Sequence, residues 1–297
     1  MDQASQLRDK IKSQPQKPHL ARVITVTSGK GGVGKSSISV NLALQLSRLG
    51  KKVIILDADF GLANVEVMLG IRPQYTLADL MFRGKELNEI ITTGPANIGF
   101  ISGGSGIQEL SNLSREQIVY LTGSLYLLDE LADYVIIDTG AGISDAVLEF
   151  VMSCSEVLLV TTPEPTSITD AYALLKTLNK KSGYDTTHTT IKMIANRVAS
   201  YEEGRELYNK LSVVVNKFLQ LKVEFLGSIP MDNTVPKALM QQKPFSLAYP
   251  KAESSKAVAD LAVMLDKHVL VNQKENKGIK ELFSDVIRSR FKKKQGE

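Results

Sequence analysis

The sequence predicts a doubly wound α/β fold, in which a mostly parallel sheet is flanked by helices on both faces. Short apolar runs alternate with helical patterns along most of the 297 residues. The apolar runs are nearly continuous in Val, Ile and Leu, as expected of strands buried on both faces of a parallel sheet. A glycine-rich segment follows the first apolar run, at the point where a strand passes into a helix.

The expected elements follow one another along the chain in strand–helix alternation. Strands are predicted at residues 22–27, 52–57, 98–102, 134–138, 156–161, 190–195 and 222–226. Helices are predicted at residues 35–49, 62–69, 76–81, 114–132, 144–153, 167–181, 201–219, 234–240 and 254–270. We expect a tag and linker at 1–20, one large domain at 21–271, and a linker with a final helix at 272–297.

The composition is that of an ordinary globular protein, with 43% hydrophobic and 23% charged residues. Cys154 is the single cysteine, which excludes an internal disulfide and any paired-cysteine metal site. The first 20 residues are polar and no apolar run approaches about 18 residues, so we expect neither a signal peptide nor a membrane span, and a cytoplasmic location. From Asn272 onward eight basic residues face four acidic ones, which accounts for the whole net charge of +4.

The most specific motif is a phosphate-binding loop, G-x-x-x-x-G-K-S, directly after the first predicted strand. Its glycines let consecutive backbone N–H groups point at one anion, Lys35 brings a charge to the β- and γ-phosphates, and the Ser36 hydroxyl can ligate Mg²⁺. The alternative is a glycine-rich turn with two solvated lysines. The predicted nucleotide-binding residues here are Gly29, Lys30, Gly31, Gly32, Val33, Gly34, Lys35, Ser36 and Ser37.

Lys30 narrows the class of nucleotide-binding protein, because an ordinary phosphate-binding loop needs no cation after its first glycine. The string from Lys30 to Lys35 resembles the deviant phosphate loop of the MinD/ParA family of ATPases. The resemblance implies that ATP is held between two subunits, with Lys30 reaching the partner's nucleotide and acting, with Lys35, in catalysis. It implies ATP as substrate, ADP as product and Mg²⁺ as cofactor, and it covers residues 22–270. A lysine in solvent is the alternative for Lys30.

Three carboxylates lie at or just after the ends of two predicted strands and should therefore face the ligand crevice. Asp57 and Asp59 resemble the D-x-D segment of this family, which implies that Asp59 orients the attacking water and that Asp57 lies close to Mg²⁺. Asp138 ends a Walker B strand and is expected to hold Mg²⁺ through water. For Asp57 and Asp59 the alternative is a helix cap.

Two later segments resemble the base-contacting loops of the family. Asn196 and Arg197 follow the strand at 190–195, and an Asn amide can both donate to and accept from the edge of adenine. Pro230 and Asp232 fit the second base-contacting loop. A strand-end cap is the alternative for Asn196.

The C-terminal segment 278–294 has a single apolar stripe flanked by basic residues. A short basic amphipathic helix of this kind can lie on an anionic membrane, and a dimer presents two such helices. We therefore expect a peripheral position at the inner face of the cell membrane in the ATP-bound state. Packing of the helix on its own domain and nonspecific DNA binding are the alternatives. The predicted membrane residues are Ile279, Leu282, Phe283, Val286, Ile287 and Phe291.

The N-terminus is a short helix-prone tag before a linker that contains prolines, and such a tag can fold on a partner. It resembles the N-terminal motif of the FlhG (YlxH) group of flagellar-number regulators within the MinD/ParA family. The resemblance implies stimulation of FlhF, a GTPase of the signal-recognition-particle type, and contact with flagellar switch (C-ring) proteins. The residues that carry it are Asp2, Gln3, Ala4, Leu7 and Arg8.

Other functions within the same fold remain open at this stage. A division-site regulator of MinD type predicts the same tail without an activating N-terminal motif. A DNA-segregation ATPase of ParA type predicts salt-sensitive DNA binding without lipid affinity, although nucleic acid is not the expected partner. A non-enzymatic adaptor predicts no response to loss of Asp59. We expect a homodimer when ATP is bound, and slow hydrolysis unless a partner stimulates it.

Overall fold

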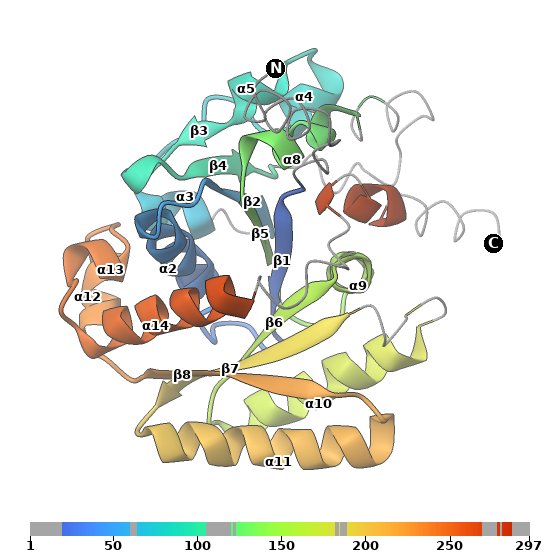
Figure 1. Ribbon diagram of the computed structural model, residues 1–297, viewed down its shortest axis with the longest axis vertical. Coiled ribbons are helices and arrows are strands. Elements are labelled where there is room, and N and C mark those ends of the chain that lie inside the picture. Colours follow the sequence, from blue (N-terminus) through green and yellow to red (C-terminus); the bar gives the residue numbers. More distant parts are fainter. Residues whose placement is uncertain are drawn as a thin grey trace, which may run out of the picture.

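The computed structural model describes residues 20–59, 64–104, 120, 123–181, 184, 189–268, 278–279 and 281–286. Its centre is a sheet of eight strands in the order β3-β4-β2-β5-β1-β6-β7-β8. All pairings are parallel except that of β3 with β4. The doubly wound parallel sheet predicted from the sequence is therefore confirmed, and Figure 1 shows the helices on both of its faces.

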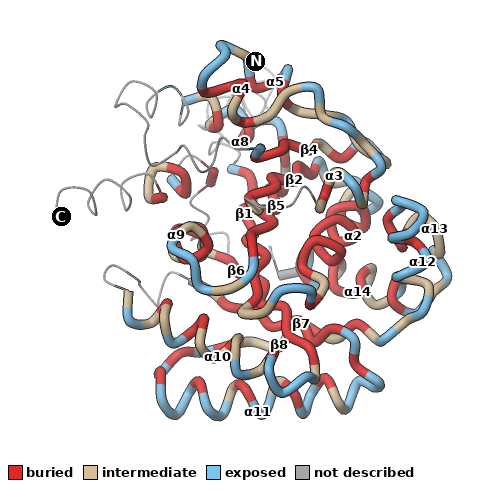
Figure 2. The backbone as a smooth tube through the Cα atoms, turned by 180° about the vertical axis from the view of Figure 1, so that it is seen from behind, coloured by how far each residue is buried: buried red, intermediate tan, exposed pale blue. Residues whose placement is uncertain are grey.

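Most of the strands carry almost uninterrupted buried residues, as Figure 2 shows for the middle of the molecule. Such strands are covered on both faces, which their Val-, Ile- and Leu-rich sequences require. The strands are β1 (Arg22–Thr27), β2 (Val53–Ala58), β3 (Thr92–Thr93), β4 (Gly99–Ser102), β5 (Tyr134–Thr139), β6 (Glu156–Thr161), β7 (Thr190–Val198) and β8 (Val223–Pro230).

The helices divide into two layers, each with its own apolar cluster against the sheet. The first layer contains α2 (Lys35–Arg48), α3 (Asn64–Leu69), α12 (Thr234–Met240), α13 (Phe245–Ala248) and α14 (Glu253–His268). The second contains α4 (Leu77–Phe82), α5 (Leu87–Ile90), α8 (Leu128–Leu131), α9 (Asp145–Ser153), α10 (Pro165–Lys180) and α11 (Tyr201–Leu219). A 3₁₀ turn, η1 (Pro95–Asn97), links β3 to β4.

Most predicted elements agree with the structure to within two residues at each end, and the differences have local causes. The strand β3 escapes prediction because two residues give no periodic signal. The strands β7 and β8 run longer than expected, since bulges between Met193 and Ile194 and between Asn196 and Val198 let their pairing continue. Much of the predicted helix 114–132 lies outside the described residues, and α8 forms its last turn.

The described part of the C-terminal segment packs on its own domain, which is the alternative to the membrane arrangement. Residues 278–279 and 281–286 are helical, and Ile279, Leu282, Phe283 and Val286 are buried in the cluster beneath α8 and α9. The ring of Phe283 meets that of Phe150 edge to face at 5.9 Å between centroids. The other two predicted membrane residues, Ile287 and Phe291, lie outside the described residues, as does the N-terminal tag with Asp2, Gln3, Ala4, Leu7 and Arg8.

One buried carboxylate joins this helix to the start of the sheet. Asp129 of α8 accepts hydrogen bonds on Oδ1 from the backbone N–H groups of Ala21 and Ile279, both at 3.1 Å. Gly278 has φ +67°, and a Cβ there would lie 2.9 Å from the Asp129 carboxylate. The last described helix is therefore fitted to the domain by polar as well as apolar contacts.

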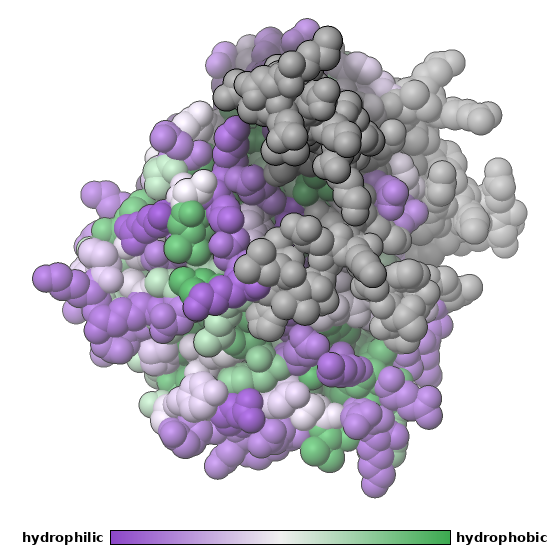
Figure 3. Space-filling model, in the orientation of Figure 1, coloured by the Kyte–Doolittle hydropathy of each residue, from purple (hydrophilic) through white to green (hydrophobic). Residues whose placement is uncertain are grey.

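The surface seen in Figure 3 is mainly hydrophilic, with apolar residues scattered in small groups. No helix among the described residues is long and apolar enough to cross a bilayer.

Candidate functional site

The phosphate-binding loop joins β1 to α2 at the carboxyl edge of the sheet. Gly32 and Gly34 have φ values of +74° and +101°, a region that only glycine enters at little cost. Gly34 is the N-cap of α2 and no side chain caps it, so no side chain competes with a ligand for the first N–H groups of the helix. The loop has the curled backbone and helix N-terminus that bind phosphate.

Gly29 is required by packing rather than by an unusual backbone angle. A Cβ at this position would lie 2.1 Å from the carbonyl carbon and oxygen of Asp170 in α10. The loop is thus seated directly on the backbone of α10. The motif alone gives no sign of this contact, since the glycine's neighbour lies far along the chain.

Asp138 is completely buried at the end of β5, next to the first turn of α2. Its Oδ1 accepts a hydrogen bond from Ser39 Oγ at 2.7 Å, and the Ser36 side chain also bonds to the carboxylate. Its Oδ2 has no hydrogen-bond partner among the described residues. Burial raises the pKa of Asp138 to about 6, despite the bonds from the two serines. An orphaned carboxylate oxygen beside Ser36 is suited to a hard cation such as Mg²⁺.

Asp57 lies on β2 opposite Asp138, so two carboxyl groups share this site. Burial, and then the charge of Asp138, raise the pKa of Asp57 to about 8. The backbone N–H of Asp59 donates to Asp57 Oδ1 at 3.0 Å. Two ionised carboxylates so close are unfavourable without a positive charge between them. The pair therefore also fits a divalent cation.

Lys35 supplies a positive charge to the same site. Burial lowers the pKa of Lys35, while the charges of Asp138 and then Asp59 act to raise it. Asp59 Oδ1 lies beside Gly140, where a Cβ would approach it to 3.3 Å. The structure therefore brings together Lys35, Ser36 and all three predicted carboxylates. Sequence reasoning missed Ser39, although its position one turn after Lys35 on α2 was a usable signal.

The ammonium group of Lys30 lies against the N-terminus of α10. It donates to Glu164 Oε2 at 2.5 Å and to Thr166 Oγ1 at 2.8 Å. Neither acceptor was predicted from the sequence as a site residue. The role of Lys30 across a dimer interface stays a prediction.

The two expected base-contacting segments lie at the ends of β7 and β8, but some of their side chains have other partners. Asn196 is 8% exposed and its Nδ2 donates to the carbonyl oxygen of Val33 at 2.7 Å, which ties β7 to the loop. Arg197 is exposed and has a left-handed backbone with φ +59°. Contact of Asn196, Arg197 and Pro230 with adenine stays a prediction.

Asp232 has a capping role that the sequence did not reveal. Its Oδ1 accepts from the backbone and hydroxyl of Thr234, and its Oδ2 accepts from those of Ser254. Burial alone would raise the pKa of Asp232, but these bonds lower it to about 2. The residue therefore joins the starts of α12 and α14, and a base contact for it stays a prediction.

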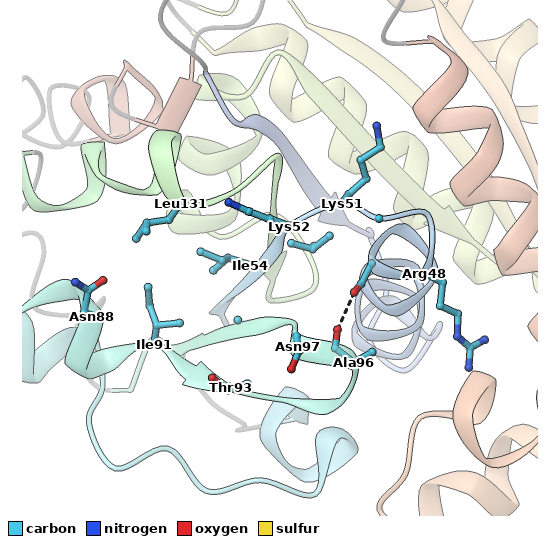
Figure 4. Close-up of a pocket in the computed structure, with 14 residues that line it drawn as sticks. Arg48, Lys51, Lys52, Ile54, Asn88, Ile91, Thr93, Ala96, Asn97 and Leu131 are labelled. Atoms are coloured by element: carbon cyan, nitrogen blue, oxygen red, sulfur yellow. Dashed lines mark hydrogen bonds between the residues drawn. The ribbon is translucent and has the colours of Figure 1, made fainter.

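A groove of about 760 Å³ lies at the other edge of the sheet, where β2 begins. Ile54, Ile91 and Leu131 gather on one side of it in Figure 4, and Lys51 and Lys52 line it as well. Because neighbouring strands are parallel, this edge is opposite the one that carries the phosphate-binding loop. The groove is therefore separate from the candidate nucleotide site.

Comparison with known proteins supports the interpretation of residues 29–36 as the phosphate-binding loop of a P-loop NTPase. A ParA family model, described as NUBPL iron-transfer P-loop NTPase, matches residues 19–265. Antiactivator FleN of Pseudomonas aeruginosa is 43% identical over 248 residues, covering 84% of this chain and 87% of that protein. Flagellum site-determining protein YlxH of Helicobacter pylori is 34% identical over 274 residues, covering 90% of each.

Solved structures of MinD proteins have the same fold. The MinC:MinD cell division complex of Aquifex aeolicus matches with a TM-score of 0.64 and 26% identity, covering 83% of this chain and 96% of that one. MinD of Pyrococcus horikoshii in complex with Mg-ADP matches with a TM-score of 0.65 and 25% identity, covering 86% and 99%.

Proposed function

This chain is a P-loop ATPase of the MinD/ParA family, and we propose that it acts as an ATP-driven switch that regulates flagellar number. The assignment to flagella is supported by its similarity to FleN and YlxH. The observation that best supports an ATP-driven switch is the buried cluster of Lys35, Ser36 and Asp138. In this cluster the Oδ2 atom of Asp138 has no hydrogen-bond partner among the described residues. Such a cluster is completed by a nucleotide with its cation.

In the proposed mechanism the loop amides and Lys35 hold the phosphates of ATP. Ser36 and Asp138, with Asp57 nearby, would hold Mg²⁺, which neutralises phosphate charge when bound. Asp59 orients the attacking water from its place beside Gly140. Lys30 of a second subunit stabilises the charge that develops on the phosphates, so that hydrolysis depends on a homodimer.

Membrane attachment in the ATP-bound state is the second part of the proposal. The four described residues of the apolar stripe, Ile279, Leu282, Phe283 and Val286, are buried on the domain, so this part of the helix must leave that site to meet lipid. Burial of each Leu, Ile, Val or Phe side chain stabilises the packed helix by about 1.5–3 kcal/mol, and this free energy is lost if the helix moves into water. If the helix moves into the acyl chains of a membrane, the side chains stay in an apolar environment. Two helices in a dimer then bind the membrane together. Anionic lipid adds attraction for the basic residues around the stripe.

The partners follow from the same resemblance. We propose that the N-terminal tag with Gln3 stimulates an FlhF-like GTPase, and that flagellar C-ring proteins bind the switch. A division-site regulator of MinD type is the second candidate, since solved MinD proteins have this fold. It differs in needing no N-terminal activation motif.

Replacement of Asp59 by Ala tests the proposal, because it would block hydrolysis without removing ATP. The variant should form a dimer with Mg·ATP and co-sediment with vesicles that contain anionic phosphatidylglycerol, and should do neither with ADP. Vesicles of neutral phosphatidylcholine are the control. A particle mass that is equal in ATP and ADP would contradict the switch. Stimulation of the GTPase by the full chain, but not by a Gln3→Ala variant, separates the flagellar function from that of MinD.

A further inference from the structure

Ser39 places a buried hydroxyl beside the candidate cation site, although it lies outside the phosphate-binding motif. It is on α2, one turn after Lys35, and residues three and four apart share a face of a helix, so Ser39 is on the same face as Lys35 and Ser36. Ser39 is 0% exposed, whereas Lys35 is 7% and Ser36 is 9% exposed. Ser39 is therefore closed off from ligands, and any role in the site must act through a neighbouring residue.

The hydroxyl of Ser39 has two oxygen atoms within hydrogen-bond distance. Asp138 Oδ1 lies at 2.7 Å and the carbonyl oxygen of Lys35 at 3.1 Å. A serine hydroxyl has one proton to donate, and the carboxylate is both the nearer and the stronger acceptor. The carbonyl four residues earlier is the acceptor that a serine inside a helix uses when it has no better one. The proton of Ser39 is therefore assigned to Asp138.

This bond fixes the orientation of the Asp138 carboxylate. Rotation of an Asp carboxylate about its Cβ–Cγ bond is soft, with broad minima, so the strand alone does not set the plane of the group. The Ser39 hydroxyl, held on α2, occupies Oδ1 and so limits that rotation. The other oxygen, Oδ2, is buried and has no hydrogen-bond partner in the described part of the chain.

We propose that Ser39 is a positioning residue that orients Asp138 so that Oδ2 is available to the bound cation. This inference rests on the proposed function, in which Asp138 holds Mg²⁺ beside the phosphates of a nucleotide. Ser36 has a second task there, because its own hydroxyl is expected to ligate the same cation. A donor that is not itself a ligand orients the carboxylate before the cation binds, so less order has to be gained on binding.

The effect should appear in the affinity for the cation and not in the affinity for nucleotide alone. Loss of a residue that orients a metal ligand typically weakens metal binding by about 10- to 100-fold. Ser39→Ala should therefore raise the Mg²⁺ concentration needed for half-maximal strengthening of ADP binding by about tenfold. ADP affinity in EDTA should equal that of wild type, because the loop amides and Lys35 are untouched. Alanine favours helix more than serine does, so α2 should form as before.

The test measures binding of a fluorescent ADP analogue to the full-length protein, in EDTA and across a series of Mg²⁺ concentrations. Ser246→Ala is the matched control. Ser246 is also 0% exposed, its backbone N–H donates to Asn41 of α2, and its hydroxyl has no hydrogen-bond partner among the residues that the structure describes. The control should need the same Mg²⁺ concentration as wild type. Ser39→Thr, which retains a hydroxyl on Cβ, should need less Mg²⁺ than Ser39→Ala.

The outcomes separate the inference from the function on which it rests. If wild type responds to Mg²⁺ and Ser39→Ala needs no more of it, the inference is wrong and the proposed function stands. The inference is also wrong if Ser39→Ala weakens ADP binding by the same factor in EDTA and in Mg²⁺, which is the effect of a merely structural residue. A Mg²⁺ requirement for Ser39→Thr as high as that for Ser39→Ala would exclude the hydroxyl as the cause. If wild type binds ADP equally well in EDTA and in Mg²⁺, the proposed cation site itself is wrong.

Discussion

Asp57 and Asp138 are paired across β2 and β5, so two buried carboxyl groups lie side by side at the carboxyl edge of the sheet. The arrangement raises the pKa of Asp57 to about 8 and that of Asp138 to about 6, in each case chiefly by burial. A protein folded around such a pair holds protons or a cation. We infer that the site exchanges one for the other when nucleotide and Mg²⁺ bind.

The stability of the nucleotide-free protein should therefore decrease as pH rises. Above the ordinary Asp pKa of 3.8 the unfolded chain releases protons that folded Asp57 keeps up to about pH 8, so the free energy of unfolding falls across this interval. Asp57→Asn removes the titration, and its melting temperature should rise relative to wild type between about pH 5 and about pH 8. Thermal unfolding measures this. Added Mg·ADP should abolish the difference in slope, and parallel pH curves without ligand would contradict the prediction.

Lys30→Ala should abolish ATP-dependent dimerisation while leaving ATP binding by the monomer within about twofold of wild type. Lys30 contacts Glu164 and Thr166 and no other described residue through its ammonium group, so its loss leaves the loop intact. Particle mass by light scattering and nucleotide binding by calorimetry give the two readouts. A Lys30→Ala dimer of unchanged affinity would refute the role of this lysine across the interface.

Gly29→Ala should prevent correct folding of the phosphate-binding loop. The added methyl group would lie 2.1 Å from the backbone of Asp170, and backbone cannot yield as a side chain can. We expect a loss of about 3 kcal/mol in the free energy of unfolding, measured in denaturant, and no detectable ATP binding. The control is Gly123→Ala, where nothing lies within 4 Å of the new Cβ. Equal stability of the two variants would show that α10 can move away from the loop.

Deletion of residues 278–297 should remove vesicle binding and also destabilise the domain. The truncated protein would expose the surface around Phe150 that Phe283 now covers, at a cost of about 2 kcal/mol or more. ATP binding should persist. Co-sedimentation with anionic vesicles and thermal unfolding test the two effects.

A charge variant separates membrane binding from packing. Replacement of Lys292, Lys293 and Lys294 by Gln should weaken vesicle binding, by about 1 kcal/mol for each lysine near the membrane, and leave stability unchanged. Unchanged co-sedimentation in both variants would exclude the membrane helix.

Local sequence was sufficient for most of the fold and for the centre of the site. Buried strands such as Val53–Ala58 are continuous apolar runs, and the glycines and Lys35 of the loop follow a fixed spacing, so both can be recognised without tertiary information. The carboxylates Asp57 and Asp138 could be placed together because parallel strands end at one edge. Membership in a P-loop ATPase family, expected from these motifs, is confirmed by the comparisons.

Contacts between residues distant in sequence could not be predicted in this way. Three such contacts join segments that are more than 100 residues apart in the sequence. They are the ion pair of Lys30 with Glu164, the close packing of Gly29 against the backbone of Asp170, and the hydrogen bond from Asn196 to Val33. Asp232 accepts hydrogen bonds at the starts of two helices, which its motif did not reveal, and its contact with the base stays a prediction. No local pattern distinguishes these roles, because each depends on which surface the folded chain brings opposite.

The sequence by itself determined the layered sheet and the chemistry gathered at one of its edges, since hydrophobic period and motif spacing are properties of short segments. Only the tertiary structure decided which partners two of its features have: the ammonium group of Lys30 lies on Glu164, and the described apolar residues of the C-terminal helix pack against α8 and α9. An ammonium group or an apolar stripe has several suitable partners. Proximity in the folded chain selects among them, because a contact already within reach costs the least entropy to form.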